Sequence, residues 1–130
     1  MQKIELKEAV TTPYVLLNAD IGEIRIEGRS IPENVIDFYY PILSWIDNYV
    51  KEPKDTTTVF FKLEYFNTSS SKRLFDIMKK VETIASQPEK KVVINWYYEE
   101  DDEDIYFAGS DYKVLIGKAE FNLIEMDATD

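Results

Sequence analysis

The residues with the clearest chemical potential are five consecutive small polar side chains, Asn67-Thr-Ser-Ser-Ser71, followed by the cations Lys72 and Arg73. Such side chains accept hydrogen bonds from the free backbone N–H groups at the start of a helix. A helix has one N-cap and only four free N–H groups, so capping explains one or two of these residues. Free N–H groups at the positive end of a helix dipole, with two cations nearby, are the ingredients of a phosphate site.

The phosphate has two sources that the residues alone do not separate. It belongs either to a bound ligand or to a covalently modified hydroxyl of Thr68, Ser69, Ser70 or Ser71. Lys72 and Arg73 are expected in the first helical turn, where the dipole disfavours each cation by about 0.3–1 kcal/mol, and an anion would reverse this effect. A polar turn with solvated charges is the third interpretation.

A strand and a helix are expected to position these residues. Residues 59–66 alternate with the period of two that is typical of a strand, and residues 91–98 do the same. Between them, apolar side chains recur at three- and four-residue steps and predict an amphipathic helix to about Ser86: Leu74, Ile77, Met78, Val81 and Ala85. The succession predicts a right-handed βαβ unit around residues 57–98 with parallel strands.

The rest of the chain extends this unit to an α/β fold, a mixed β-sheet with helices packed on it, in a single domain covering residues 1–130. Short strands are predicted over 4–8, 14–18 and 21–27, and a helix over 34–50 in which Pro41 predicts a kink or a break. A further helix is predicted over 104–116, although Gly109 lowers its propensity by about 1 kcal/mol. A last strand near Phe121 precedes a frayed tail at 127–130.

Composition excludes several functions. The chain has 15 basic and 25 acidic side chains, and its net charge of −10 repels nucleic acid and anionic membranes, so a protein partner with a basic face fits better. It contains no cysteine and no histidine, which excludes disulfides, the usual zinc sites and a Ser-His-Asp triad. No apolar run approaches the roughly 18 residues that span a bilayer, so a cytoplasmic protein is expected. We assign no catalytic residue, metal or cofactor.

Two other patterns favour ordinary interpretations. Ser69 and Lys72 match the Ser-x-x-Lys pattern of penicillin-binding enzymes, but the companion motifs of a Ser-Lys hydrolase are missing. The six acids from Glu99 to Asp104 offer oxygen ligands for Mg²⁺ or Ca²⁺. That run lacks the alternation and glycine of a calcium loop, so a solvated loop is favoured.

Aromatic residues are expected beside the polar turn. In a parallel pair, Tyr65 and Phe66 finish at the same sheet edge as Tyr97 and Tyr98, and partners of open α/β sheets gather at that carboxyl edge. Tyrosine-rich rims are also favoured at protein interfaces. The predicted partner-binding or phosphate-supporting residues are Tyr65, Phe66, Asn67, Ser69, Ser70, Ser71, Lys72, Arg73 and Tyr98.

The sequence resembles the SiaC family of bacterial regulatory phosphoproteins over nearly its whole length. The resemblance lies in Tyr65-Phe-Asn-Thr-Ser-Ser-Ser-Lys72, Ile31-Pro-Glu-Asn34, Phe38-Tyr-Tyr-Pro-Ile42 with Trp45, Val93-Ile-Asn-Trp-Tyr-Tyr98 and the acidic run from Glu99 to Asp104. It implies a fold like that of STAS domains and anti-sigma-factor antagonists, with Thr68 as the phosphorylated residue. The implied partners are an anti-sigma-type protein kinase, a metal-dependent serine/threonine phosphatase and, in some members, a diguanylate cyclase that links the module to cyclic di-GMP and biofilm control.

The resulting hypothesis is a non-enzymatic interaction module that phosphorylation of Thr68 controls. A phosphate at a helix terminus stabilises the fold by at most about 2 kcal/mol. Placing a near-dianion in an interface built for a hydroxyl costs several kcal/mol, and about 2.7 kcal/mol already weakens binding a hundredfold. The switch is therefore expected to act on the surface. The alternative is a small-anion or nucleotide-binding domain that uses the helix N-terminus at Ser69–Lys72.

Overall fold

The computed structural model describes residues 1–127, so most of the tail predicted at 127–130 lies outside the described residues. The elements follow one another as β1 (Ile4–Leu6), β2 (Tyr14–Asn18), β3 (Glu23–Ser30), α1 (Val35–Tyr49), β4 (Thr56–Phe66), α2 (Thr68–Glu82), the short 3-10 helix η1 (Thr83–Ser86), β5 (Lys91–Glu99), α3 (Glu103–Leu115) and β6 (Glu120–Met126). The described strands form one sheet whose spatial order is the same as their order in the chain.

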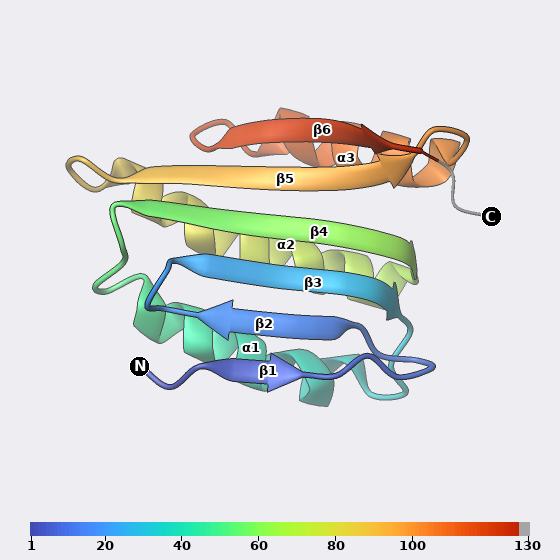
Figure 1. Cartoon of the computed structure of the whole chain (residues 1–130), viewed down its shortest axis with the longest axis horizontal. Helices are drawn as coiled ribbons and strands as arrows, with labels where there is room; N and C mark the ends of the chain where they lie inside the picture. The colour runs from blue at the N-terminus through green and yellow to red at the C-terminus, as the bar shows by residue number, and fades with distance from the viewer. Residues whose placement is uncertain (128–130) are drawn as a thin grey trace.

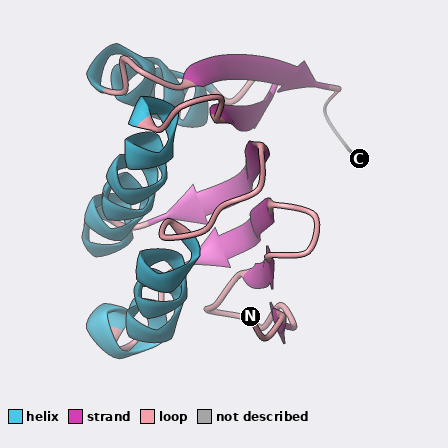
Figure 2. Cartoon of the chain, turned by 90° about the vertical axis from the view of Figure 1, so that its left-hand side faces the viewer, coloured by secondary structure: helices cyan, strands magenta, loops and turns pink. Residues whose placement is uncertain are grey.

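The topology places all three helices on one face of the sheet. Strands β1 to β3 pair antiparallel, and β3 to β6 pair parallel. Each parallel connection passes through a helix and adds its strand on the same side of the previous one. Because such crossovers are right-handed, every helix arrives on the same face. Figures 1 and 2 show this two-layer arrangement, which confirms the predicted α/β fold and its βαβ unit.

The core lies between the sheet and the helices. Alternate side chains of the central strands point toward the helices and are completely buried, as the period of two predicts. They meet the apolar stripes of α1 and α2. The fully buried members of this layer include Ile24, Ile26, Val59, Phe61, Ile94 and Trp96 from the sheet, and Ile42, Ile46, Leu74, Ile77 and Met78 from the helices.

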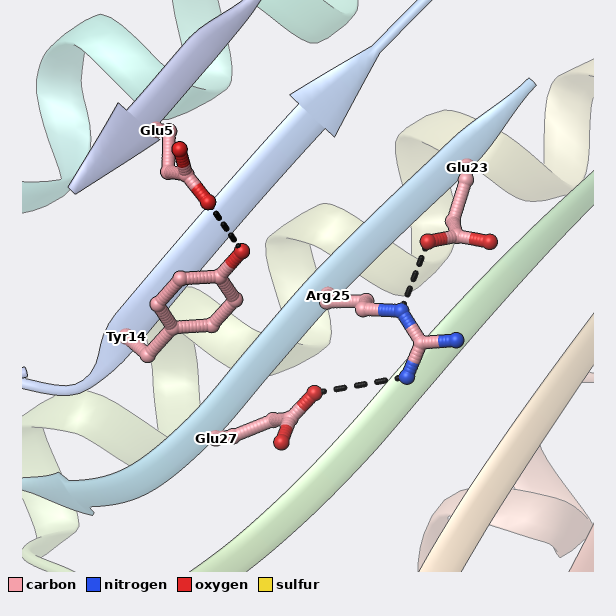
Figure 3. A network of polar contacts seen from close by, with 5 residues as sticks. All are labelled: Glu5, Tyr14, Glu23, Arg25 and Glu27. Carbon is pink, nitrogen blue, oxygen red and sulfur yellow. Dashed lines mark hydrogen bonds and ion pairs between the residues drawn. The ribbon is translucent and has the colours of Figure 1, made fainter. Parts of the chain in front are cut away.

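Within residues 1–127 no helix lies over the opposite face of the sheet, and its own side chains cover part of it. Arg25 forms ion pairs with Glu23 (2.6 Å) and Glu27 (3.4 Å), as Figure 3 shows. The guanidinium of Arg25 also lies 3.9 Å from the centre of the Phe60 ring. Long charged side chains can cover apolar surface while their charged ends stay in water. This face is therefore half-buried without a partner layer.

Helix α1 runs without a break through Pro41, so of the two expected effects of this proline, a kink or a break with a fresh start, the break is wrong. A proline removes one backbone hydrogen bond and crowds the carbonyl of the residue four positions earlier, here Asp37. Both Pro41 and Asp37 are exposed, so water can satisfy that carbonyl. Buried apolar residues on both sides of the proline, including Tyr39 and Ile42, hold the helix against the sheet.

Candidate functional site

Helix α2 begins earlier than the sequence indicates. Asn67 is its N-cap: the Asn67 side-chain oxygen accepts a 2.9 Å hydrogen bond from the Ser70 N–H. The hydroxyl residues Thr68 to Ser71 therefore form the first turn instead of a loop. Lys72 and Arg73 belong to the second turn, so the expectation of two cations in the first turn is wrong. The dipole disfavours cations mainly within the first turn, so relief of a penalty on Lys72 and Arg73 gives little reason for an anion here.

The four hydroxyls of this turn differ in their access to solvent. Thr68 and Ser69 are exposed. Ser70 is completely buried, and its hydroxyl donates a 2.9 Å hydrogen bond to the Ser30 carbonyl. Ser71 is half-buried, and its hydroxyl donates to the Thr68 carbonyl at 2.7 Å. A modifying enzyme can therefore reach Thr68 and Ser69, whereas the buried Ser70 hydroxyl is inaccessible to it.

A buried chain of hydroxyls anchors the start of α2 to the rest of the fold. The Ser30 hydroxyl donates to the Ser70 hydroxyl at 2.9 Å and lies 2.6 Å from the hydroxyl of Tyr39 on α1. Burial raises the pKa of Tyr39 to about 12, so its hydroxyl stays neutral and can donate to Ser30. These bonds join the end of β3, helix α1 and the first turn of α2. The sequence did not predict the roles of Ser30 and Tyr39; the available signal was a small polar residue, Ser30, at the end of a strand with alternating apolar residues.

Helix α3 is also attached to this turn. The Tyr112 hydroxyl donates a 2.8 Å hydrogen bond to the Ser71 carbonyl, and its ring stacks on Phe75 with centroids 6.2 Å apart. Burial raises the pKa of Tyr112 to about 12. Three separate segments thus hold the backbone around Thr68 in place, while the Thr68 side chain itself faces solvent.

The two predicted cations do not converge on the helix start. Lys72 is exposed. The Arg73 Nε lies 3.1 Å from an Asp76 carboxylate oxygen, an ion pair whose geometry does not make a hydrogen bond. This contact directs the Arg73 charge along the helix toward its second and third turns. An anion at the first turn would therefore meet backbone N–H groups more than side-chain cations.

A cleft opens beside the start of α2, at the carboxyl edge of the sheet. Strands β4 and β5 pair only as far as Phe61 and Trp96, and Figure 1 shows the strands separating beyond that point. The resulting cleft has a volume of about 340 Å³. Its lining combines apolar and acidic residues: Glu64, Tyr65, Phe66, Asp102, Asp104, Ile105 and Ala108. Tyr65 and Phe66, which the sequence placed at this edge of the sheet, thus line the cleft.

Tyr98, which the sequence placed at the same edge, is not among the residues that line the cleft. Its ring packs edge-on against Tyr106 with centroids 5.0 Å apart, and burial raises its pKa. The acidic run from Glu99 to Asp104 divides between the end of β5, a turn and the first turn of α3, where Asp102 is the N-cap. Among residues 1–127, no group of three His, Cys, Asp or Glu side chains is arranged to hold a metal ion. None of the described helices is long and apolar enough to cross a membrane.

Fold and site together define a class: a two-layer α/β protein with an exposed hydroxyl turn, aromatic rings and carboxylates gathered at the carboxyl edge of its sheet. The family model described as SiaC family regulatory phosphoprotein matches residues 6–126. The chain therefore belongs to the SiaC family, as its motifs indicated.

The chain is also similar to individual proteins and solved structures. An uncharacterised protein of Pseudomonas aeruginosa strain UCBPP-PA14 is 25% identical over 105 residues, which cover 81% of this chain and 82% of that protein. The crystal structure of apo-SiaC from Pseudomonas aeruginosa has a TM-score of 0.81 at 20% identity and covers 98% of this chain and 100% of its own. A chain in the crystal structure of the diguanylate cyclase SiaD with its activator SiaC, from the same species, has a TM-score of 0.86 at 20% identity, covering 95% of this chain and 99% of its own. These structures confirm the fold.

Proposed function

We propose that this protein is a phosphorylation-controlled interaction module in bacterial signalling, and that it is not itself an enzyme. An anti-sigma-type kinase phosphorylates Thr68 in the cytoplasm, and a metal-dependent serine/threonine phosphatase removes the phosphate. The phosphorylation state decides whether the surface around Thr68 accepts its partner, a diguanylate cyclase whose activity controls biofilm formation. Membership in a family of regulatory phosphoproteins and the SiaD–SiaC complex of Pseudomonas aeruginosa support this proposal.

The observation that carries the proposal is the exposure of the Thr68 side chain on a rigidly held helix turn. The neighbouring Ser70 hydroxyl is buried, and Ser71 donates to a backbone carbonyl, so neither is equally available. Thr68 and Ser69 are both accessible, and the family pattern selects Thr68 between them. A kinase can reach Thr68 without unfolding the helix.

The phosphate is expected to act on docking and not on the fold. At the first position of α2 it would stabilise the helix by at most about 2 kcal/mol. In an interface that had buried the Thr68 hydroxyl, an uncompensated near-dianion would cost several kcal/mol, which exceeds the roughly 2.7 kcal/mol of a hundredfold change in affinity. The buried Tyr39–Ser30–Ser70 hydroxyls keep the turn in the same position in both states.

The small-anion alternative has less support in the geometry. One N–H group of the first turn, that of Ser70, already donates to Asn67. Arg73 pairs with Asp76, and the nearby cleft carries carboxylates that repel a free phosphate. A thermal-shift titration with inorganic phosphate and with nucleotides tests it directly.

The decisive experiment is intact-mass analysis after incubation with an anti-sigma-type kinase from the same organism and ATP. Wild type and Ser69→Ala are expected to gain one phosphate, and Thr68→Ala none. The phosphorylated and unmodified proteins are then compared for binding to the cognate diguanylate cyclase, with about a hundredfold difference expected. No phosphate on wild type, or equal phosphorylation of Thr68→Ala, would refute the proposal.

A further inference from the structure

The side of helix α3 that faces away from the sheet carries large apolar residues that are exposed in the part of the chain that the structure describes. Phe107 is 58% exposed, Val114 81%, Leu115 58% and Tyr106 36%. Positions 107 and 114 are seven residues apart, so they lie on the same line along the helix. The opposite side of α3 is apolar as well, because Ile105 and Tyr112 are buried against the sheet. Helix α3 thus carries apolar side chains on both sides, with charged residues between them.

Scattered exposed apolar residues need no explanation, but four on one 13-residue helix form a patch. We call Tyr106, Phe107, Val114 and Leu115 the α3 surface. Ring contacts connect part of it: Tyr106 and Phe107 pack at 5.5 Å between centroids.

Carboxylates surround the α3 surface. Glu103, Asp104 and Asp111 are exposed on the same helix, whose one cation is Lys113. On the side facing β4, Asp104 also lines the cleft that contains Glu64 and Asp102. The apolar centre is thus bounded by negative charge, and a complementary ligand needs apolar side chains with cations beside them.

We propose that the α3 surface docks a cationic, amphipathic segment of a partner protein. A second copy of this chain is a poor occupant, because a two-fold contact would place the same carboxylates against one another. Anionic lipid and nucleic acid are repelled by the net charge of −10. The inference rests on the proposed function, because it specifies the kind of segment that the partner presents next to the Thr68 turn. Helix α3 is attached to that turn through Tyr112.

The test is an NMR titration of the unmodified, isotopically labelled protein with a designed amphipathic peptide of leucines and lysines, about 14 residues or four helical turns long. Two comparison peptides replace every lysine by glutamate or every leucine by serine. The leucine–lysine peptide is expected to shift the resonances of α3, and neither comparison peptide should do so. Raising the salt from about 0.05 to about 0.5 M should weaken binding several-fold, because screening lengths fall to a few ångströms.

Matched variants locate the contact. Phe107→Ser and Val114→Ser should each weaken peptide binding at least about tenfold, while Val10→Ser should leave it unchanged. Val10 is 85% exposed and lies between β1 and β2, away from α3. All three residues are exposed, so circular dichroism should show intact folding in all three variants. Shifts spread over the acidic surface, equal binding of the glutamate peptide, or full binding by Phe107→Ser would overturn the proposal.

The two proposals fail separately. Kinase labelling of Thr68 does not require the α3 surface, so labelling with no peptide binding would refute the α3 surface alone. Peptide binding at α3 without labelling would refute the switch and leave the docking surface standing.

Discussion

Replacement of Gly109 by alanine tests how α3 is seated on the sheet. In an exposed helix this change stabilises the protein by about 1 kcal/mol, because alanine has the higher helix propensity. At Gly109 an added Cβ would lie 2.8 Å from Cγ of Trp96 and closer still to Cδ1 and Nε1. Side-chain carbons do not approach rings this closely, so either the Trp96 ring or helix α3 must move.

The Trp96 ring has little freedom to move. It is completely buried, and its Nε1–H donates a 2.9 Å hydrogen bond to the Ile105 carbonyl on α3. The rings of Phe61, Phe66 and Tyr112 lie with centroids 5.4–5.9 Å from it. Overpacking costs about 1–3 kcal/mol and a weakened hydrogen bond about 1 kcal/mol. After subtraction of the propensity gain, Gly109→Ala should lower the free energy of unfolding by about 1–3 kcal/mol.

Urea unfolding followed by tryptophan fluorescence measures this change. Gly117→Ala is the matched control, because its Cβ would have nothing within 4 Å, and it should stay within about 0.5 kcal/mol of wild type. The double-mutant cycle with Trp96→Phe should show a coupling of opposite sign to the single loss, since the smaller ring relieves the contact. If Gly109→Ala proves as stable as wild type or more so, the proposed packing of α3 on Trp96 is refuted.

Two further changes test the ends of helix α2. Asn67→Ala removes the cap from the Ser70 N–H and should cost about 1 kcal/mol in thermal or urea unfolding, whereas Asn67→Asp keeps an acceptor and should cost little; equal losses would contradict the capping role. At the other end, burial alone raises the pKa of Glu82, but hydrogen bonds, first that from the Lys118 N–H, hold it below its usual value of 4.5. Its charge therefore stabilises the fold above about pH 4.5, and this contribution disappears as the pH falls through the lowered pKa. Glu82→Gln should lose about 1–2 kcal/mol at pH 7 and approach wild type near pH 3; a pH-independent difference would contradict this linkage.

The strand and helix pattern was predictable because burial on one side leaves a clear period in the sequence. Residues 59–66 alternate along β4, and Leu74, Ile77 and Met78 recur along α2, so local spacing alone predicted both elements and their parallel successor. Even α3 was predicted despite Gly109, whose presence the Trp96 ring now explains.

The start of α2 could not be predicted in the same way. Serine and threonine are compatible with a loop and with a first helical turn, so four of them in a row do not determine the boundary. The boundary is set by the burial of Ser70 against Ser30, forty positions away in the chain. For the same reason the cations Lys72 and Arg73 were predicted in the first turn of the helix and lie in the second. The point at which β4 and β5 separate depends on which neighbouring strand each of them pairs with. The local sequence pattern does not contain that information.

The agreement between strand order in space and strand order in the chain has a consequence for biosynthesis. A chain emerging from the ribosome can add β4, β5 and β6 one at a time beside strands that are already in place, without leaving a gap for a later segment to fill. Every partly synthesised intermediate is then a smaller sheet with its newest strand at the growing edge. The segment from β5 to β6, which brings the acidic turn and α3, is the last to join, so the α3 surface is completed only after the hydroxyl turn has already formed.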